Sequence, residues 1–293
     1  MQAILRNRSP RKYSFVQTIG AITDFQTDPP AKSTVLSKHF PNLIFVAVFL
    51  VGLAGSVRSA EQIRPPPIGA PKGAPPEYTR FDPSELETGF LRLAFGSDMQ
   101  RFSESEDRIH KFDHQVRFHI TSTASRDRSD SYLRVLDDFS VQVPQIDIAA
   151  VDASVPPDVI VRLLDSKDFA STLAGALGKG TARDFIDQTN PRCTTRSRAD
   201  EKGGILRADI FIVVDKGNDV FLDCAYHETL HALGLMNHAD DIPWTTLNQN
   251  RRVGYLSVYD LAMLQMLYDR RIRAGMGRSE VETLLPQIIR DLK

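Results

Sequence analysis

The sequence predicts an α+β fold, in which a mixed, twisted sheet is followed by a helix that carries the functional site and by a helical C-terminal subdomain. Two observations lead to this class. Strand patterns and helix patterns are mixed between residues 81 and 214, whereas helix patterns dominate from Val220 to the end. Because the strongest strand, Ile205 to Val214, comes directly before the first of those helices, we expect the site at their junction.

The elements of the mixed part follow from hydrophobic spacing. "PSELETGFLRLAFG", which begins at Pro83, places Leu86, Phe90 and Leu93 on one face of a helix. "HQVRFHIT" alternates apolar and polar residues, as a half-buried strand does. The patterns that come next predict a helix around 132–139, strands in "IDIAAVDA" and "DVIVRLL", a helix in "SKDFASTLAGALG" and the strand 205–214.

The chain before residue 81 has a different character. Residues 1–60 form an N-terminal extension whose apolar run, 43–54, is short for a membrane span and has the length of a signal-peptide core. We therefore expect a signal peptide or a signal anchor there, and no other contact with a membrane. Residues 61–80 are crowded with proline and glycine, which predicts an extended linker. Residues 81–293 remain as one domain.

Charge and cysteine content narrow the function classes. The formal net charge is -1, with 36 Lys and Arg against 37 Asp and Glu, so no global field favours nucleic acid and we expect no such partner. Cys193 and Cys224 are the two cysteines of the chain. In an exported protein an even number favours one disulfide, and the alternative is two unpaired buried thiols.

Residues 219–235, "DVFLDCAYHETLHALGL", have a helical pattern and contain the sequence His-Glu-x-x-His. His227 and His231 are four residues apart and face the same way on a helix, so both imidazoles can bind one tetrahedral metal ion. Glu228, beside the first histidine, can take a proton from a metal-activated water. The pattern predicts a Zn²⁺ centre with Glu228 as the general base. The alternative is a chance match in an ordinary amphipathic helix.

Two families resemble this part of the chain. "HETLHALGLMNHADD" resembles the metzincin motif His-Glu-x-x-His-x-x-Gly-x-x-His, in which a glycine turns the chain and a third histidine returns to the metal. "SVYDLAMLQMLYD", residues 257–269, is similar to the C-terminal helix of matrixins and serralysins. The resemblance implies a metzincin-like fold for residues 81–293. Residues 81–290 also resemble a family of exported bacterial proteins of unknown function, whose motif is Cys-x-x-(His/Glu)-Glu-x-x-x-Ala-Leu-Gly-Leu-x-Asn.

The third ligand departs from the metzincin spacing, because Asn237 stands at its position and His238 comes one residue later. Adjacent side chains of an extended segment point in opposite directions, so a shift of one residue matters. We expect His238 to be the ligand, since imidazole binds zinc better than a carboxamide does. Asn237, Asp240 and Asp241 are the alternatives. Leu247 stands where a metzincin turn has its methionine and can supply the same apolar floor.

These observations predict an exported zinc-dependent peptidase, periplasmic or extracellular, that hydrolyses peptide, protein or cell-wall peptide. The predicted residues are the ligands His227, His231 and His238 and the base Glu228. The competing hypothesis is a non-catalytic binding domain of the cell envelope with a degenerate or structural metal site. Two tyrosines near the predicted site, Tyr255 and Tyr259, are expected to pack rather than to stabilise an oxyanion.

Overall fold

The computed structural model describes residues 14–17, 63–67, 69–95 and 107–292. The apolar run 43–54, where a signal peptide or anchor is expected, lies outside these residues. Among the helices within them, none is long and apolar enough to cross a membrane.

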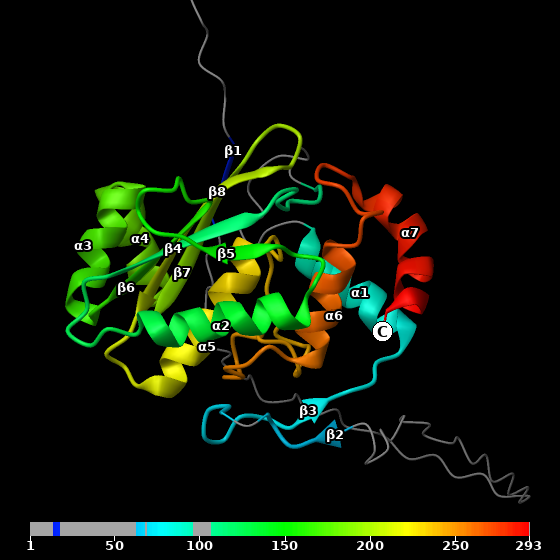
Figure 1. Cartoon of the computed structure of the whole chain (residues 1–293), viewed down its shortest axis with the longest axis horizontal. Helices are drawn as coiled ribbons and strands as arrows, with labels where there is room; N and C mark the ends of the chain where they lie inside the picture. Colours follow the sequence, from blue (N-terminus) through cyan, green and yellow to red (C-terminus); the bar gives the residue numbers. More distant parts are fainter. Residues whose placement is uncertain (1–13, 18–62, 68, 96–106, 293) are drawn as a thin grey trace, which may run out of the picture.

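The centre of the molecule is a mixed sheet in the order β1-β7-β8-β6-β4-β5 (Figure 1). Neighbouring strands β5, β4, β6 and β8 are parallel, whereas β7 is antiparallel to β8, and β1 pairs antiparallel with the outer edge of β7. The strands are β1 (Ser14–Gln17), β4 (Val116–Ser122), β5 (Ile148–Ala150), β6 (Val159–Leu164), β7 (Cys193–Ala199) and β8 (Ile205–Val213). This mixed sheet with surrounding helices confirms the predicted α+β class.

Helices cover both faces of the sheet, and alternate residues of β8 are therefore buried on opposite sides. Ile210 and Ile212 belong to the main core with α2 and α5, whereas Phe211 and Val213 pack with α3 and α4. A strand buried on both faces explains why "ILRADIFIVV" is an almost continuous apolar run. The four helices are α2 (Ser129–Gln142), α3 (Ser166–Leu177), α4 (Lys179–Thr189) and α5 (Asn218–Ala232).

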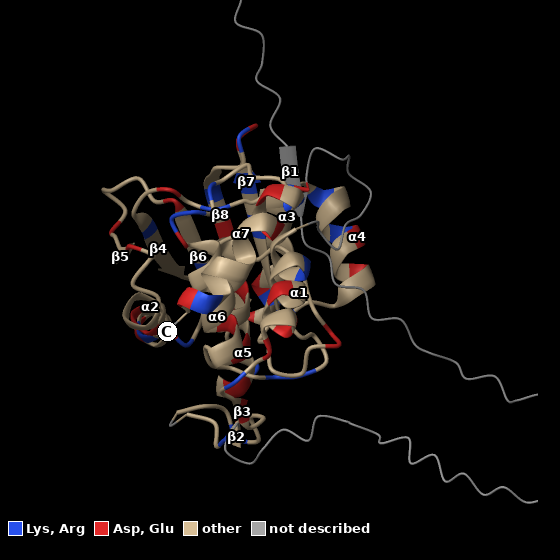
Figure 2. Cartoon of the chain, turned by 90° about the vertical axis from the view of Figure 1, so that its right-hand side faces the viewer, with Lys and Arg blue, Asp and Glu red and all other residues tan. Residues whose placement is uncertain are grey.

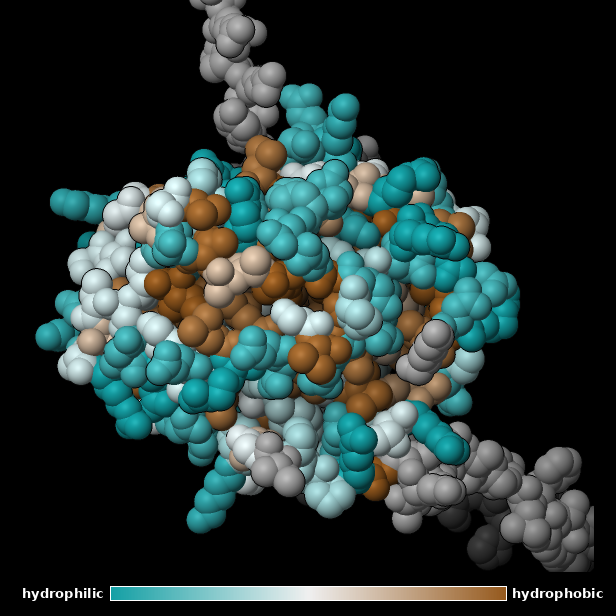
Figure 3. Space-filling model, viewed as in Figure 1, coloured by the Kyte–Doolittle hydropathy of each residue, from teal (hydrophilic) through white to brown (hydrophobic). Residues whose placement is uncertain are grey.

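The first helix of the domain packs with the two C-terminal helices. α1 (Pro83–Ala94) packs against α6 (Val258–Leu267) and α7 (Arg278–Asp291), so the C-terminal helices are completed by a helix that precedes the sheet. Together with the sheet they form one apolar core. On the face shown in Figure 3, hydrophilic residues cover most of the surface and hydrophobic atoms are visible in its middle.

The segment predicted as a linker contacts the domain. We call residues 63–67 and 69–80 the N-terminal strap; it contains a small hairpin of β2 (Ile63–Arg64) and β3 (Glu77–Tyr78). The buried carboxylate of Glu77 accepts a hydrogen bond from the backbone N–H of Val258 at 3.0 Å. Tyr255 donates to the carbonyl of Pro75 at 3.1 Å, and the rings of Tyr78 and Trp244 lie 4.7 Å apart. The strap therefore supports the loop between α5 and α6.

Removing the strap is expected to destabilise the domain. A chain that begins at Phe81 loses the two hydrogen bonds and the ring contact just described, and the partly buried N–H of Val258 loses its acceptor. We expect the free energy of unfolding to fall by about 2 to 4 kcal/mol relative to a chain that begins at Glu61. Urea denaturation of both chains measures this difference. Equal midpoints would show that the strap contributes no stability.

Candidate metal centre

Helix α5 and the turn after it bring three histidines together. His227 and His231 are one turn apart on α5, which ends before Gly234. Gly234 has φ of +113°, and a Cβ atom there would lie 2.1 Å from the carbonyl oxygen of His110, so the position requires glycine. The chain then returns toward the helix and places His238 opposite the first two rings.

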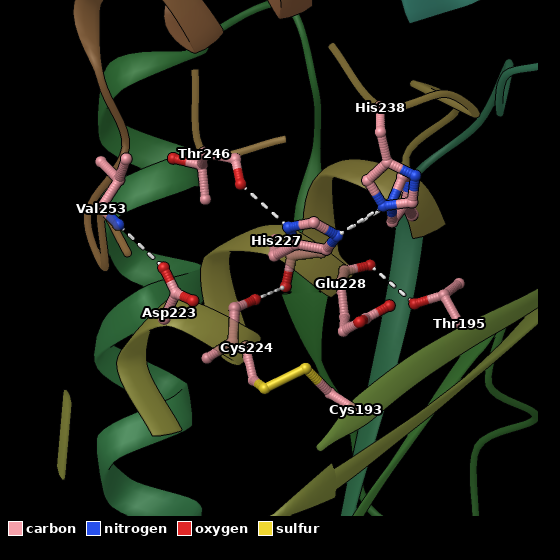
Figure 4. The surroundings of a disulfide bond; sticks show 12 residues. Cys193, Thr195, Asp223, Cys224, His227, Glu228, His238, Thr246 and Val253 are labelled. Atoms are coloured by element: carbon pink, nitrogen blue, oxygen red, sulfur yellow. Dashed lines mark hydrogen bonds between the residues drawn. A yellow bond between two sulfur atoms is a disulfide. The ribbon is translucent and has the colours of Figure 1, made fainter. Parts of the chain in front are cut away.

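The Nε2 atoms of the three histidines form a nearly equilateral triangle. The distances are 3.0 Å between His227 and His238, 3.1 Å between His227 and His231, and 3.2 Å between His231 and His238. A tetrahedral zinc ion with bonds of about 2.0 to 2.1 Å to nitrogen separates its ligand atoms by about 3.3 to 3.4 Å. The triangle thus fits three ligands of one small ion. Figure 4 shows His227 and His238 turned toward each other.

The other ring nitrogens hold the imidazoles in the orientation that a metal needs. Nδ1 of His227 lies 2.9 Å from the carbonyl of Thr246, and Nδ1 of His231 lies 2.6 Å from the carbonyl of Leu235. A carbonyl accepts only from a protonated Nδ1, which leaves Nε2 with its lone pair facing the centre. Burial, followed by repulsion from His238, lowers the pKa of His227 to about 3, and burial also lowers the pKa of His231. Both rings are therefore neutral at pH 7.

The geometry distinguishes His238 from the three alternative ligands. The side-chain amide of Asn237 donates to the carbonyls of Arg92 and Phe95, in the direction of α1. Asp240 accepts from the backbone N–H of Gln249, and Asp241 forms a surface ion pair with Arg92. Among the described residues, the histidine triad is the group of His, Cys, Asp and Glu side chains placed to share one ion. The alternation of side chains along the extended segment accounts for this difference.

Glu228 lies in the same cleft as the histidines and is 4% exposed. Burial, the largest effect, raises the pKa of its carboxyl group to about 8, and the nearby Asp223 acts in the same direction. The hydroxyl of Thr195, on β7, donates to the backbone carbonyl of Glu228 at 3.0 Å and fixes this turn of α5 to the sheet (Figure 4). A dication bound to the histidines would favour the ionised carboxylate. Glu228 thus lines the cleft together with the three histidines.

The cleft over the histidines has a volume of about 320 Å³. One wall is the beginning of β7, with Thr194 and Thr195, and the floor is α5. Strand β1 pairs with β7 only from Arg196 to Ala199. In the part of β7 that lines the cleft, the edge that faces away from β8 therefore has no partner strand among the described residues. Strand β7 was not predicted, because "CTTRSRA" is polar and lacks an apolar alternation.

The predicted disulfide between Cys193 and Cys224 is present. It joins the first residue of β7 to α5, one turn before His227, and so connects the wall of the cleft to the helix that carries the centre (Figure 4). Cys224 is therefore no metal ligand. A disulfide of this kind is typical of proteins in oxidising compartments.

Replacing both cysteines by serine is expected to lower the free energy of unfolding by about 3 to 4 kcal/mol, because the bond closes a loop across 31 positions of the unfolded chain. Urea denaturation of the metal-free proteins measures this change. Dithiothreitol serves as the control, since it should destabilise the natural chain and leave the double variant unchanged. A variant as stable as the natural chain would contradict this role of the bond.

The turn at residues 245–248 is fixed by a buried carboxylate. Asp260, in the first turn of α6, accepts hydrogen bonds from the hydroxyls of Thr245 and Ser257 and from the backbone N–H of Thr246. The carbonyl of Thr246 is the one that orients His227. Leu247, at the position of the metzincin methionine, is fully buried in the same turn. Asp260 thus positions the ring of His227 through one intervening residue.

The two tyrosines near the centre pack away from the cleft. The hydroxyl of Tyr255 donates to Pro75, and that of Tyr259 donates to the carbonyl of Glu85 at 3.4 Å. Neither lines the cleft, as expected for packing residues.

The fold and the centre define a class: an α+β protein with a three-histidine cluster on and after the helix that follows the last strand of its sheet. The chain belongs to the family described as "Protein of unknown function (DUF2927)", whose model matches residues 83–287. This span contains strands β4 to β8, the three histidines and α6, and it excludes the strap. Membership of a family of unknown function was expected from the motif around Cys224. No curated protein matches the chain.

Proposed function

We propose that this protein is an exported zinc-dependent peptidase with a metzincin-like centre. The observation that supports the proposal most is the convergence of the Nε2 atoms of His227, His231 and His238 in a cleft that also contains Glu228. Two neutral, carbonyl-anchored imidazoles and a third ring at the same distance are a donor set that suits zinc. Export is supported by the disulfide and by the apolar run 43–54.

Each residue of the centre has a role in hydrolysis of a peptide bond. Zinc, when bound by the three histidines, lowers the pKa of water and polarises the carbonyl group of the substrate. Glu228 accepts the proton of the attacking water and delivers it to the leaving amine. Its burial keeps that proton from bulk solvent between the two steps. Thr246 and Leu235 hold the rings of His227 and His231 through their carbonyls.

The cleft suits an extended peptide. Thr194 and Thr195 lie at the beginning of β7, where its outer edge has no partner strand among the residues described. An extended chain can add to such an edge through main-chain hydrogen bonds, which are independent of side-chain identity. This placement would bring a peptide bond to the histidines and favours peptides, proteins or cell-wall peptides as substrates.

The metzincin likeness rests on specific elements and has two departures. A mixed sheet, a helix with two histidines, a glycine turn and a third histidine occur in the expected order. The third histidine comes one residue late, and Leu247 replaces the methionine of the turn. Since His238 joins the triad and Leu247 is fully buried, both departures are compatible with a working centre.

The proposal is tested by assaying the purified full chain against casein and a quenched-fluorescent peptide library. We expect hydrolysis that a chelator abolishes and that about one equivalent of zinc restores. Zinc-loaded protein that cleaves none of these substrates would favour the competing hypothesis, a binding domain with a structural metal.

A further inference from the structure

The cleft over the histidines carries an excess of positive side chains. Arg192 stands directly before β7, and Arg251 and Arg252 lie on the loop between α5 and α6, so the three arginines enter the cleft from two separate segments. All three are exposed. The acidic residues in the lining are Asp223 and Glu228, so three cations face two carboxylates. A bound zinc ion would add two further positive charges.

No described carboxylate forms an ion pair with these arginines, so their guanidinium groups can bind a ligand. Arg252 lies near Asp223, whose carboxylate accepts a hydrogen bond from the backbone N–H of Val253 at 2.8 Å. Arg251 donates to the carbonyl of Pro243 at 3.3 Å. None of the three arginines of the cleft forms an ion pair with another described residue. Eight arginines elsewhere do: Arg64, Arg92, Arg117, Arg162, Arg183, Arg207, Arg271 and Arg278.

The positive charge is local. The two signs are interspersed along the elements, as Figure 2 shows, and the chain has a formal net charge of -1. A general preference for polyanions would need a broader basic surface. The arginines lie around the cleft that holds the histidines, where a ligand of that cleft would meet them. Guanidinium groups bind carboxylates through two parallel hydrogen bonds, which gives selectivity as well as attraction.

We propose that the cleft selects peptides that carry a carboxylate, from an acidic side chain or a free C-terminus, and that Arg192, Arg251 and Arg252 recognise it. The proposal rests on the peptidase function and specifies its substrate class. The arginines are specificity residues beside the centre and take no part in the proton transfers.

Binding is measured with the zinc-loaded full chain carrying Glu228→Gln, so that no peptide is consumed. Four fluorescent peptides of equal length are compared: a neutral peptide blocked at both ends, the same peptide with Glu replacing Gln, the same with Lys replacing Gln, and the neutral peptide with a free C-terminus. We expect the two peptides with a carboxylate to bind about 10-fold more tightly than the neutral one, and the preference to weaken with salt. The two arms distinguish a side-chain carboxylate from a terminal one.

The deciding variant is Arg192→Gln, Arg251→Gln and Arg252→Gln combined. It is expected to lose the preference for a carboxylate, retain the affinity for the neutral peptide and keep its zinc. Its matched control changes Arg126, Arg270 and Arg273 to Gln, which alters the net charge equally at exposed positions outside the cleft. A preference that survives in the cleft variant, or disappears equally in the control, overturns the proposal. So does equal affinity of the parent for all four peptides.

The peptidase proposal can fail separately. A wild-type chain that binds zinc and cleaves nothing refutes hydrolysis, while the same binding series still decides whether the arginines recognise a carboxylate. Cleavage without any difference in affinity among the four peptides would support the peptidase function and refute the proposed substrate class.

Discussion

Replacing Glu228 by glutamine is expected to lower kcat for peptide hydrolysis by about 10²- to 10⁴-fold. The amide has nearly the same size as the carboxyl group but cannot accept the proton of the attacking water. Because Glu228 lies beside His227 without belonging to the triad, zinc content should stay at that of the natural chain. Steady-state kinetics and metal analysis of the two purified proteins measure both quantities.

The fold of this variant provides the control. Burial raises the pKa of Glu228 to about 8, so the metal-free protein already holds the group protonated near pH 7, and a neutral amide should cost no stability. The free energy of unfolding of the metal-free protein should fall as the pH rises from the ordinary pKa of a glutamate toward 8, because the buried group resists ionisation. The glutamine variant should not show this fall in stability. A variant with normal zinc and full peptidase activity would refute the role of Glu228 as the general base.

Replacing Asp260 by alanine is expected to lower the free energy of unfolding by about 3 to 5 kcal/mol. The carboxylate is fully buried and accepts from two hydroxyls and one backbone N–H, all of which would lose their acceptor. The carbonyl of Thr246 would also lose its fixed position against His227. We therefore expect zinc affinity to fall by about 10- to 100-fold, as it does when outer partners of metal ligands are removed. Denaturant titration and competition with a zinc chelator measure the two effects.

Two further variants separate the causes. Asp260→Asn keeps the size and one acceptor oxygen, so its effects should be intermediate. Asp241→Ala removes an exposed carboxylate of the loop between α5 and α6. This carboxylate pairs with Arg92 at the surface, and its loss should change stability by less than about 1 kcal/mol. If Asp260→Ala binds zinc as tightly as the natural chain, then the turn at 245–248 does not position His227 through this carboxylate.

The sequence predicted the elements whose pattern is local. Strand β8 is an almost continuous apolar run, and the histidine pair follows from the four-residue spacing on a helix. His238 was predicted from ligand chemistry, because imidazole binds zinc better than a carboxamide does, and the structure places it with the other two rings. These inferences need only a few consecutive residues.

The features that were missed depend on contacts between distant segments. β7 is polar along its length, and its strand conformation comes from pairing with β8. The strap is rich in proline, and nothing in its composition indicates that Glu77 meets Val258 across 181 positions. Asp260 resembles an ordinary residue of a first helical turn until the fold surrounds it with donors. Arg192 is far in the sequence from the adjacent pair Arg251 and Arg252, and the three side chains meet only in the folded chain.

We propose that His227, His231 and His238 bind one metal ion. The most direct test is the zinc content of the purified full chain compared with His238→Ala and Asn237→Ala, determined by mass spectrometry after dialysis against trace zinc. A three-histidine site predicts about one zinc per chain in the natural protein and in the Asn237 variant, and a large loss in the His238 variant. No zinc in the natural chain, or loss in the Asn237 variant alone, would contradict it.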